Sequence, residues 1–269
     1  MTDGSEYNRV KTTQLSIRIL ETIKELDGAR LSEIVSSLDI AKSTAHKHLH
    51  TLEEAGYLIK EGGTYQIGLK FLNLGEYARE RWPGFEYIKN AVGELTERTD
   101  EECDFVVEDH GRVTTIEESY HKWVKYEEPS DGPPSKEYRA RIGSYYYIHA
   151  TASGLAILAE YPTERVNEII NKWGLPAKTE YTITSQSTLF DELEQVAERG
   201  YSVDDQGYAE GMRSIGKAVH GPDGRVLGAL SVSGPAYRVD GVVLQEKIPN
   251  ELIAVVDSLE QTLEEEAPL

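Results

Sequence analysis

The stretch from residue 38 to residue 58, LDIAKSTAHKHLHTLEEAGYL, decides the fold of the first part of the chain. Within it Ala45, Leu49 and Leu52 follow the spacing i, i+4, i+7, which places them on one face of a helix that begins near Ala41. The opposite face is centred on polar residues, with His46 and Thr51 beside them: Ser43, Lys47, His50 and Glu54. The pattern predicts a helix with a narrow buried stripe and a broad polar surface.

Two further helices precede this one. Apolar residues recur every three or four positions from Leu15 to Leu26, and Asp27-Gly28 ends that pattern. Residues 31–38 predict a short second helix with Ser32 as its N-cap, and a tight turn at Asp39-Ile40 leads into the third.

The pattern changes to period two after Ala55-Gly56. Residues 57–60 and 65–67 read as two short strands around Gly62-Gly63, which is a hairpin. Three helices followed by a hairpin predict a winged helix-turn-helix domain, in which the third helix enters the DNA major groove.

The third helix supplies the candidate DNA contacts. Hydroxyls in its first turn can donate to phosphate, its lysines can reach guanine or phosphate, and its histidines can donate or accept at base edges. The candidates are Lys42, Ser43, Thr44, His46, Lys47 and His50. His48 lies nearer the buried side and is predicted to pack. The alternative is that this polar face is simply exposed to solvent and that the winged-helix domain binds a protein instead of DNA.

The charge of the chain is distributed unevenly. The 269 residues carry a net charge of -19, yet residues 1–70 hold 9 Lys and Arg against 10 Asp and Glu, which leaves 19 against 37 for the rest. Residues 40–52 contain no acid. The overall charge taken alone argues against nucleic acid, but the acidity lies outside the predicted reading helix. We interpret it as the solvation of a protein that lives in concentrated salt.

Other classes of protein receive little support. The single Cys103 excludes a disulfide framework and a thiolate zinc cluster, and its acidic neighbours raise rather than lower a thiol pKa. No motif of nucleotide-binding, hydrolase or zinc-protease type occurs, so we expect no cofactor, metal or catalytic site. No apolar run of about 18 residues and no signal-peptide pattern is present, which predicts a soluble, cytoplasmic protein without a membrane partner.

The remainder of the chain predicts an α+β domain. An apolar helical face from Phe71 to Trp82 indicates a connecting helix that ends at Trp82-Pro83-Gly84 and could mediate dimerisation. Beyond it a helix at 85–98, strands at 103–107, 112–119, 214–220 and 225–233, and a final amphipathic helix indicate an antiparallel sheet flanked by helices. Residues 127–136 read as a loop.

Small and polar residues indicate a binding site in this second domain. Residues 149–154 open a helix whose first N–H groups could face an anion, and Ser231 and Ser233 share one face of a strand that follows the strand of Ser214. Such neutral donors suit a small carboxylate. Close packing of Ser and Gly explains the same pattern equally well.

These segments together resemble the IclR family of transcriptional regulators. The similarity rests on residues 38–58 and on GLKFLNLGEYA (68–78), IHATASGLAILA (148–159), RGYSVDD (199–205), EGMRSIGKAV (210–219) and GRVLGALSVSGP (224–235). The resemblance implies a GAF-like effector domain, a homodimer or tetramer, and palindromic promoter DNA. It places the family's pocket on Ala152, Ser153, Asp204, Met212, Ser214, Ser231 and Ser233.

The chain departs from the family pattern at three positions. Ser214 replaces a usual Cys, Leu155 a usual Lys, and Lys47 a usual Arg, so that Lys47 offers a point charge in place of a two-pronged guanine contact. With its acidity, the resemblance indicates an archaeal regulator from a halophile.

The expected organisation is a winged helix-turn-helix at 1–68, a linker helix at 69–84 and an effector and oligomerisation domain at 85–269. The expected function is that of a regulator, not an enzyme, whose promoter binding responds to an organic acid. The alternative is a winged-helix protein whose second domain is an enzyme or a docking module without DNA contact.

Overall fold

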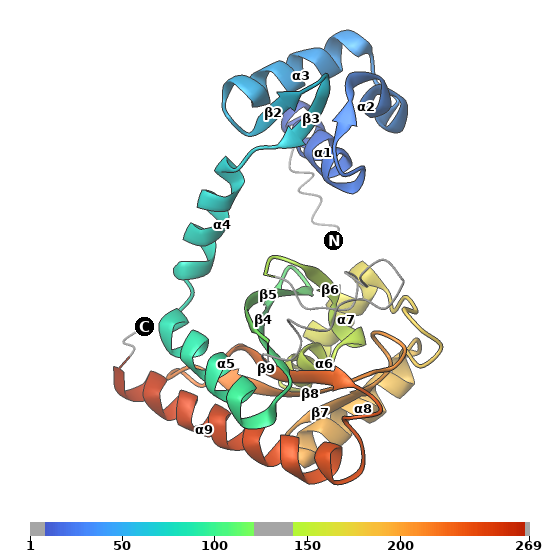
Figure 1. Ribbon diagram of the computed structural model, residues 1–269. Coiled ribbons are helices and arrows are strands. Elements are labelled where there is room, and N and C mark those ends of the chain that lie inside the picture. Colours follow the sequence, from blue (N-terminus) through green and yellow to red (C-terminus); the bar gives the residue numbers. More distant parts are fainter. Residues whose placement is uncertain (1–8, 121–141, 267–269) are drawn as a thin grey trace, which may run out of the picture. The chain divides into compact units, whose positions relative to one another are not determined.

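The computed structural model describes residues 9–120 and 142–266, and the predicted loop at 127–136 lies outside them. The chain divides into two compact units, one up to Glu80 and one from Arg81, which Figure 1 draws in blue-green and in green to red. None of the described helices is long and apolar enough to cross a membrane.

The first unit is a three-helix domain with a small sheet. Its elements are α1 (Lys11–Glu25), β1 (Ala29–Arg30), α2 (Leu31–Leu38), α3 (Lys42–Glu54), β2 (Leu58–Glu61), β3 (Thr64–Ile67) and α4 (Lys70–Glu80). The core joins Ile19 and Ile23 of α1 to Ile34, Leu49 and Leu58. The strand order β1-β3-β2 confirms the predicted hairpin and adds the two-residue strand β1, which is too short to give a periodic signal.

Left-handed residues follow the first two helices of this unit where the sequence predicts that these helices end. Asp27 (φ 52°) and Gly28 (φ 99°) follow α1, and Asp39 (φ 49°) follows α2. The predicted N-cap of α2 is wrong. Arg30, not Ser32, is the cap, because β1 extends to it and its backbone N–H donates to Glu33 Oε2 at 2.7 Å.

The second unit is built on a six-stranded antiparallel sheet of order β6-β5-β4-β9-β8-β7. The strands are β4 (Glu102–Asp109), β5 (Arg112–Ser119), β6 (Tyr145–Tyr147), β7 (Ser202–Asp205), β8 (Met212–His220) and β9 (Val226–Pro235). The helices are α5 (Phe85–Thr99), α6 (Ala152–Ala159), α7 (Thr163–Trp173), α8 (Gln186–Arg199) and α9 (Ile248–Glu266). Two short helical segments complete it, η1 (Ile148–Ala150) and η2 (Val243–Lys247). The predicted α+β class is confirmed.

Helices cover both faces of this sheet (Figure 1). Helices α5 and α9 pack on one face with Phe105 and Leu230, while α6, α7 and α8 pack on the other with Val106 and Ala229. The predicted final helix is confirmed as α9, since its apolar stripe of Leu252, Val255, Val256, Leu259 and Leu263 is buried.

Strand alternation fixes what each face of the sheet presents. Cys103, Phe105 and Val107 of β4 join the core beneath α5 and α9. Successive side chains of a strand point to opposite faces, so Glu102 and Asp104 are turned toward the face that α6 covers.

The connecting helix is shorter than predicted. Helix α4 ends at Glu80 and α5 begins at Phe85, so the predicted stop at Trp82-Pro83-Gly84 falls in the segment between the two. No residue of α4 is buried, and Leu69, Leu72 and Tyr77 on or beside it are among the exposed large apolar residues.

Candidate functional site

The outer face of α3 gathers the predicted DNA-contacting residues. Ala45 and Leu49 are fully buried and hold the helix against α1 and α2. Thr44 is half-buried. The other five predicted residues are exposed: Lys42, Ser43, His46, Lys47 and His50. The arrangement leaves two lysine ammonium groups and two imidazole rings free to contact a partner on one side of the helix.

His48 contributes to packing, as predicted. Its ring is half-buried and Nδ1 lies 2.8 Å from the Ser16 hydroxyl of α1. This hydrogen bond ties the third helix to the first and leaves His48 outside the exposed set.

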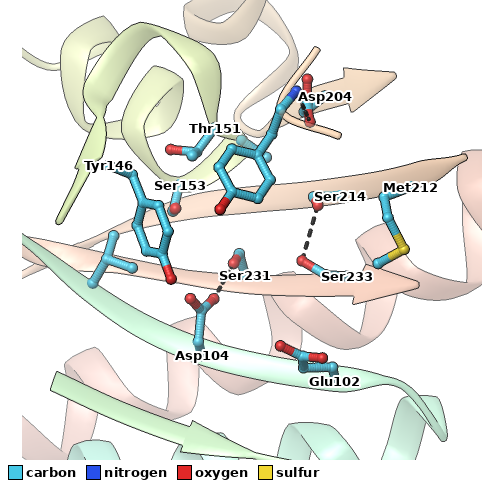
Figure 2. Close-up of a pocket in the computed structure, with 13 residues that line it drawn as sticks. Glu102, Asp104, Tyr146, Thr151, Ser153, Asp204, Met212, Ser214, Ser231 and Ser233 are labelled. Atoms are coloured by element: carbon cyan, nitrogen blue, oxygen red, sulfur yellow. Dashed lines mark hydrogen bonds between the residues drawn. The ribbon is translucent and has the colours of Figure 1, made fainter. Parts of the chain in front are cut away.

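All seven predicted effector residues line one pocket of the second unit. The pocket contains about 530 Å³ of space not filled by protein atoms, part of it open to solvent. Figure 2 shows it between the sheet and the start of α6. The predicted residues are Ala152, Ser153, Asp204, Met212, Ser214, Ser231 and Ser233, and they are joined by Glu102, Asp104, Val106, Tyr146, Thr151 and Tyr208.

A glycine lets α6 approach the sheet closely. A Cβ on Gly216 of β8 would lie 2.7 Å from the backbone nitrogen of Ser153 and 2.7 Å from the carbonyl carbon of Ala152. The Ser202 hydroxyl donates to the Ala152 and Gly216 carbonyls at 2.5 and 3.1 Å and fixes the same contact. The helix start is thus held rigidly at one wall of the pocket.

Neutral hydroxyl groups cross the centre of the pocket. Ser214 and Ser233 are paired residues of β8 and β9 whose hydroxyl oxygens are 2.9 Å apart. Among the first N–H groups of α6, which the sequence predicts to be available to an anion, that of Gly154 instead donates to Thr151 Oγ1 at 3.1 Å. Ser153, 4% exposed, has no hydrogen-bond partner among the described residues.

Two buried carboxyl groups face the pocket from opposite sides (Figure 2). Burial raises the pKa of Asp104 to about 6, and the Ser231 hydroxyl donates a hydrogen bond to this side chain. Burial likewise raises the pKa of Asp204 to about 7, although the carboxyl accepts from the N–H groups of Gly207 and Tyr208 at 2.9 and 3.2 Å.

Cys103 belongs to the opposite face of the sheet. It is fully buried, and burial raises the pKa of its thiol to about 12, with smaller contributions of the same sign from Asp104 and Glu102. Its burial and raised pKa agree with the prediction that this thiol is a poor nucleophile. Among the described residues no group of three or more His, Cys, Asp and Glu side chains could hold a metal ion.

Comparison with protein families identifies both units. Residues 16–62 match the IclR helix-turn-helix domain, and residues 85–260 match the family described as bacterial transcriptional regulator IclR C-terminal. The chain belongs to the IclR family. It is therefore a transcriptional regulator with a helix-turn-helix DNA-binding domain and a C-terminal effector-binding domain.

Individual members of the IclR family are similar in sequence over most of this chain. The probable HTH-type transcriptional regulator ArcR of Halobacterium salinarum is 28% identical over 97% of both chains. The transcriptional repressor IclR of Escherichia coli is 26% identical over 86% of this chain and 82% of its own. These relatives are named regulators, which speaks against the alternative of an enzymatic second domain.

A solved structure has the same fold. The IclR homologue from Microbacterium hydrocarbonoxydans, crystallised with 4-hydroxybenzoate, superposes with a TM-score of 0.75 over 94% of this chain and 98% of that one, at 24% identity.

The IclR-family resemblance did not lead to six of the pocket residues. Glu102 and Asp104 carried a signal that could have been used, because they alternate with apolar Cys103, Phe105 and Val107 in a strand of period two. Tyr146, Thr151 and Tyr208 reach the pocket from segments without a periodic signal.

Proposed function

We propose that the chain is a promoter-binding regulator in which the exposed face of α3 reads palindromic DNA and the pocket beneath α6 binds a small organic acid. In this proposal the protein acts as a homodimer or tetramer. The observation that carries it is the convergence of all seven residues implied by the family resemblance on one pocket.

The six residues of α3 support the DNA-binding half of the proposal. They form a continuous polar surface on a helix whose other face is packed, and no acidic residue lies between residues 40 and 52. Lys47 stands on the central part of the exposed face, where it can reach a guanine acceptor or a phosphate.

Substitution of Lys47 tests this half. Lys47→Ala should weaken operator binding by about 1 to 3 kcal/mol, as loss of one base or phosphate contact does. Lys24→Ala, which removes an exposed lysine from α1, is the matched control and should change little. Unchanged affinity of Lys47→Ala in a mobility-shift titration would remove Lys47 from the reading surface.

The serines of the pocket test the effector half. Ser214→Ala combined with Ser231→Ala should abolish the response to the effector and leave DNA binding intact, since both hydroxyls line the pocket and lie outside the DNA-binding unit. The relative crystallised with 4-hydroxybenzoate makes organic acids the class to screen first. A compound that raises the melting temperature of wild type and double variant equally would contradict the pocket.

Several finer features belong to the same proposal. Residues 1–68 form the DNA-binding domain, residues 69–84 the linker and residues 85–269 the effector-binding domain. Helix α4 within the linker transmits the conformational change caused by the effector to the DNA-binding domains. The second unit is GAF-like. The net charge of -19 and the similarity to a Halobacterium salinarum regulator support a halophilic archaeal source.

A further inference from the structure

The charge of the pocket is unusual for a site that binds a simple organic acid. Three carboxyl side chains line it, Glu102 and Asp104 from β4 and Asp204 from β7, and its described lining includes no Lys, Arg or His. A ligand with only a carboxylate would bring a further negative charge close to these three carboxyl groups.

Asp104 provides the first step toward the chemistry of the ligand. It is 7% exposed; the neutral Ser231 hydroxyl donates to its carboxylate, the neutral Thr115 hydroxyl also lies close enough to favour its charged form, and Glu118 adds a further negative charge nearby. Its pKa of about 6 leaves it mostly ionised at neutral pH. A buried carboxylate is strongly favoured by a positive partner, and in Figure 2 the Asp104 carboxylate is directed into the pocket, where a ligand can supply that partner.

Asp204 differs from Asp104 in its hydrogen bonds. Both of its carboxylate oxygens accept backbone N–H groups, from Gly207 and Tyr208, which hold the loop after β7. The hydrogen bonds of Asp204 are therefore already used to hold this loop, so Asp104 is the carboxylate better placed to bind a positively charged group.

Ser153 provides the second, independent step. The residue is 4% exposed and lines the pocket, and its hydroxyl makes no hydrogen bond to another described residue, so it is open to a ligand. Ser153 is also in the first turn of α6, where the helix dipole favours a negative group. A negatively charged ligand atom that accepts a hydrogen bond from Ser153 would give this hydroxyl a partner and would also interact favourably with the helix dipole.

We propose that the effector is zwitterionic, a small amino-carboxylate whose protonated nitrogen pairs with Asp104 and whose carboxylate accepts from Ser153 at the start of α6. This inference rests on the proposed role of the pocket as the effector site and names the class of ligand. It keeps the organic acid of that proposal and adds a cationic nitrogen, so that the ligand brings no net charge to the acidic pocket.

Matched pairs of compounds test the nitrogen directly. The probes are the proteinogenic amino acids and 4-aminobutyrate, with lactate, 2-hydroxyisocaproate, phenyllactate and malate as the hydroxy-acid counterparts of alanine, leucine, phenylalanine and aspartate. Thermal shift of the full chain finds the binders, and titration calorimetry gives their affinities at pH 7.5. At least one amino-carboxylate should bind, and replacement of its amino group by hydroxyl should weaken binding at least tenfold.

Two variants assign the contacts. Asp104→Asn should weaken the amino-carboxylate at least tenfold and spare the hydroxy acid, whereas Ser153→Ala should weaken both. Asp191→Asn, an exposed carboxyl of α8, is the control. Circular dichroism checks the fold, and Ser153→Ala keeps the test available if Asp104→Asn does not fold.

The possible results separate this inference from the proposal beneath it. Hydroxy acids that bind as tightly as the amino-carboxylates, or a panel in which no amino-carboxylate binds, would overturn the zwitterionic ligand and leave the pocket as an effector site. Ligand binding that survives both Ser153→Ala and the Ser214→Ala, Ser231→Ala pair would overturn the pocket itself.

Discussion

The buried carboxyl of Asp104 should make the second unit less stable as the pH rises. Its pKa is about 6 in the folded chain against an ordinary value of 3.8, so the folded state binds its proton more tightly than the unfolded state. The associated stability is fully present below about pH 3.8 and is lost as the pH rises to about 6. Asp104→Asn keeps an oxygen that accepts from Ser231 and removes the ionisation.

The two pKa values give the magnitude. At about 1.36 kcal/mol per pKa unit, the difference between 3.8 and about 6 corresponds to roughly 3 kcal/mol of unfolding free energy. About half of it, roughly 1.4 kcal/mol, is lost between pH 5 and pH 8 by the same relation. Asp204 titrates in the same range in both proteins, so the difference between wild type and variant isolates Asp104.

Urea unfolding at pH 5, 6.5 and 8 provides the assay, with far-UV circular dichroism and tryptophan fluorescence recorded together because the two units can unfold separately. The advantage of Asp104→Asn over wild type should grow by about 1.4 kcal/mol from pH 5 to pH 8. An advantage that stays constant, or shrinks, across this range would refute the claim that burial raises the pKa of Asp104 and that its ionisation destabilises the second unit.

Two further substitutions probe a close helix–sheet contact and a buried ion pair of the second unit. Gly216→Ala should destabilise the second unit by about 1 to 3 kcal/mol and weaken effector binding, because its Cβ would press on the start of α6; a variant with unchanged melting temperature and affinity would argue against that close contact. Arg238→Met should destabilise it by about 3 kcal/mol, because Glu101, paired with Arg238 at 2.6 Å through each oxygen, is buried and would lose its cation. If Glu101→Gln combined with Arg238→Met is no more stable than Arg238→Met alone, the buried charge is not the cause.

Much of the fold follows from periodicity in the sequence. Two local patterns predict elements that the structure contains: the apolar stripe of Ala45 and Leu49 predicts a helix, and Gly62-Gly63 predicts a hairpin turn. Both predictions are confirmed, because the tertiary packing favours the same local structure as the sequence pattern. The N-cap of α2 was missed because Glu33 accepts from Arg30, a contact that depends on β1 pairing with β3.

The pocket was predictable only in part. Ser214, Ser231 and Ser233 were found because alternation in adjacent strands places them on one face. The alternation of Glu102 and Asp104 with apolar residues shows that they share a strand face, but their place in the pocket depends on β4 lying next to β9, which no local pattern reveals. The burial of these carboxyl groups in the pocket therefore follows only from the pairing of β4 with β9.

DNA binding by the intact protein tests the central claim most directly. Fluorescence anisotropy with a fragment from upstream of the protein's own gene and with a scrambled fragment, in a series of KCl concentrations, gives both the specificity and the salt slope. We expect a clear preference for the upstream fragment with a shallow salt dependence, since residues 1–70 have 9 basic against 10 acidic residues and release few counterions. Equal binding to both fragments at every salt concentration would contradict the proposed reading of DNA by α3.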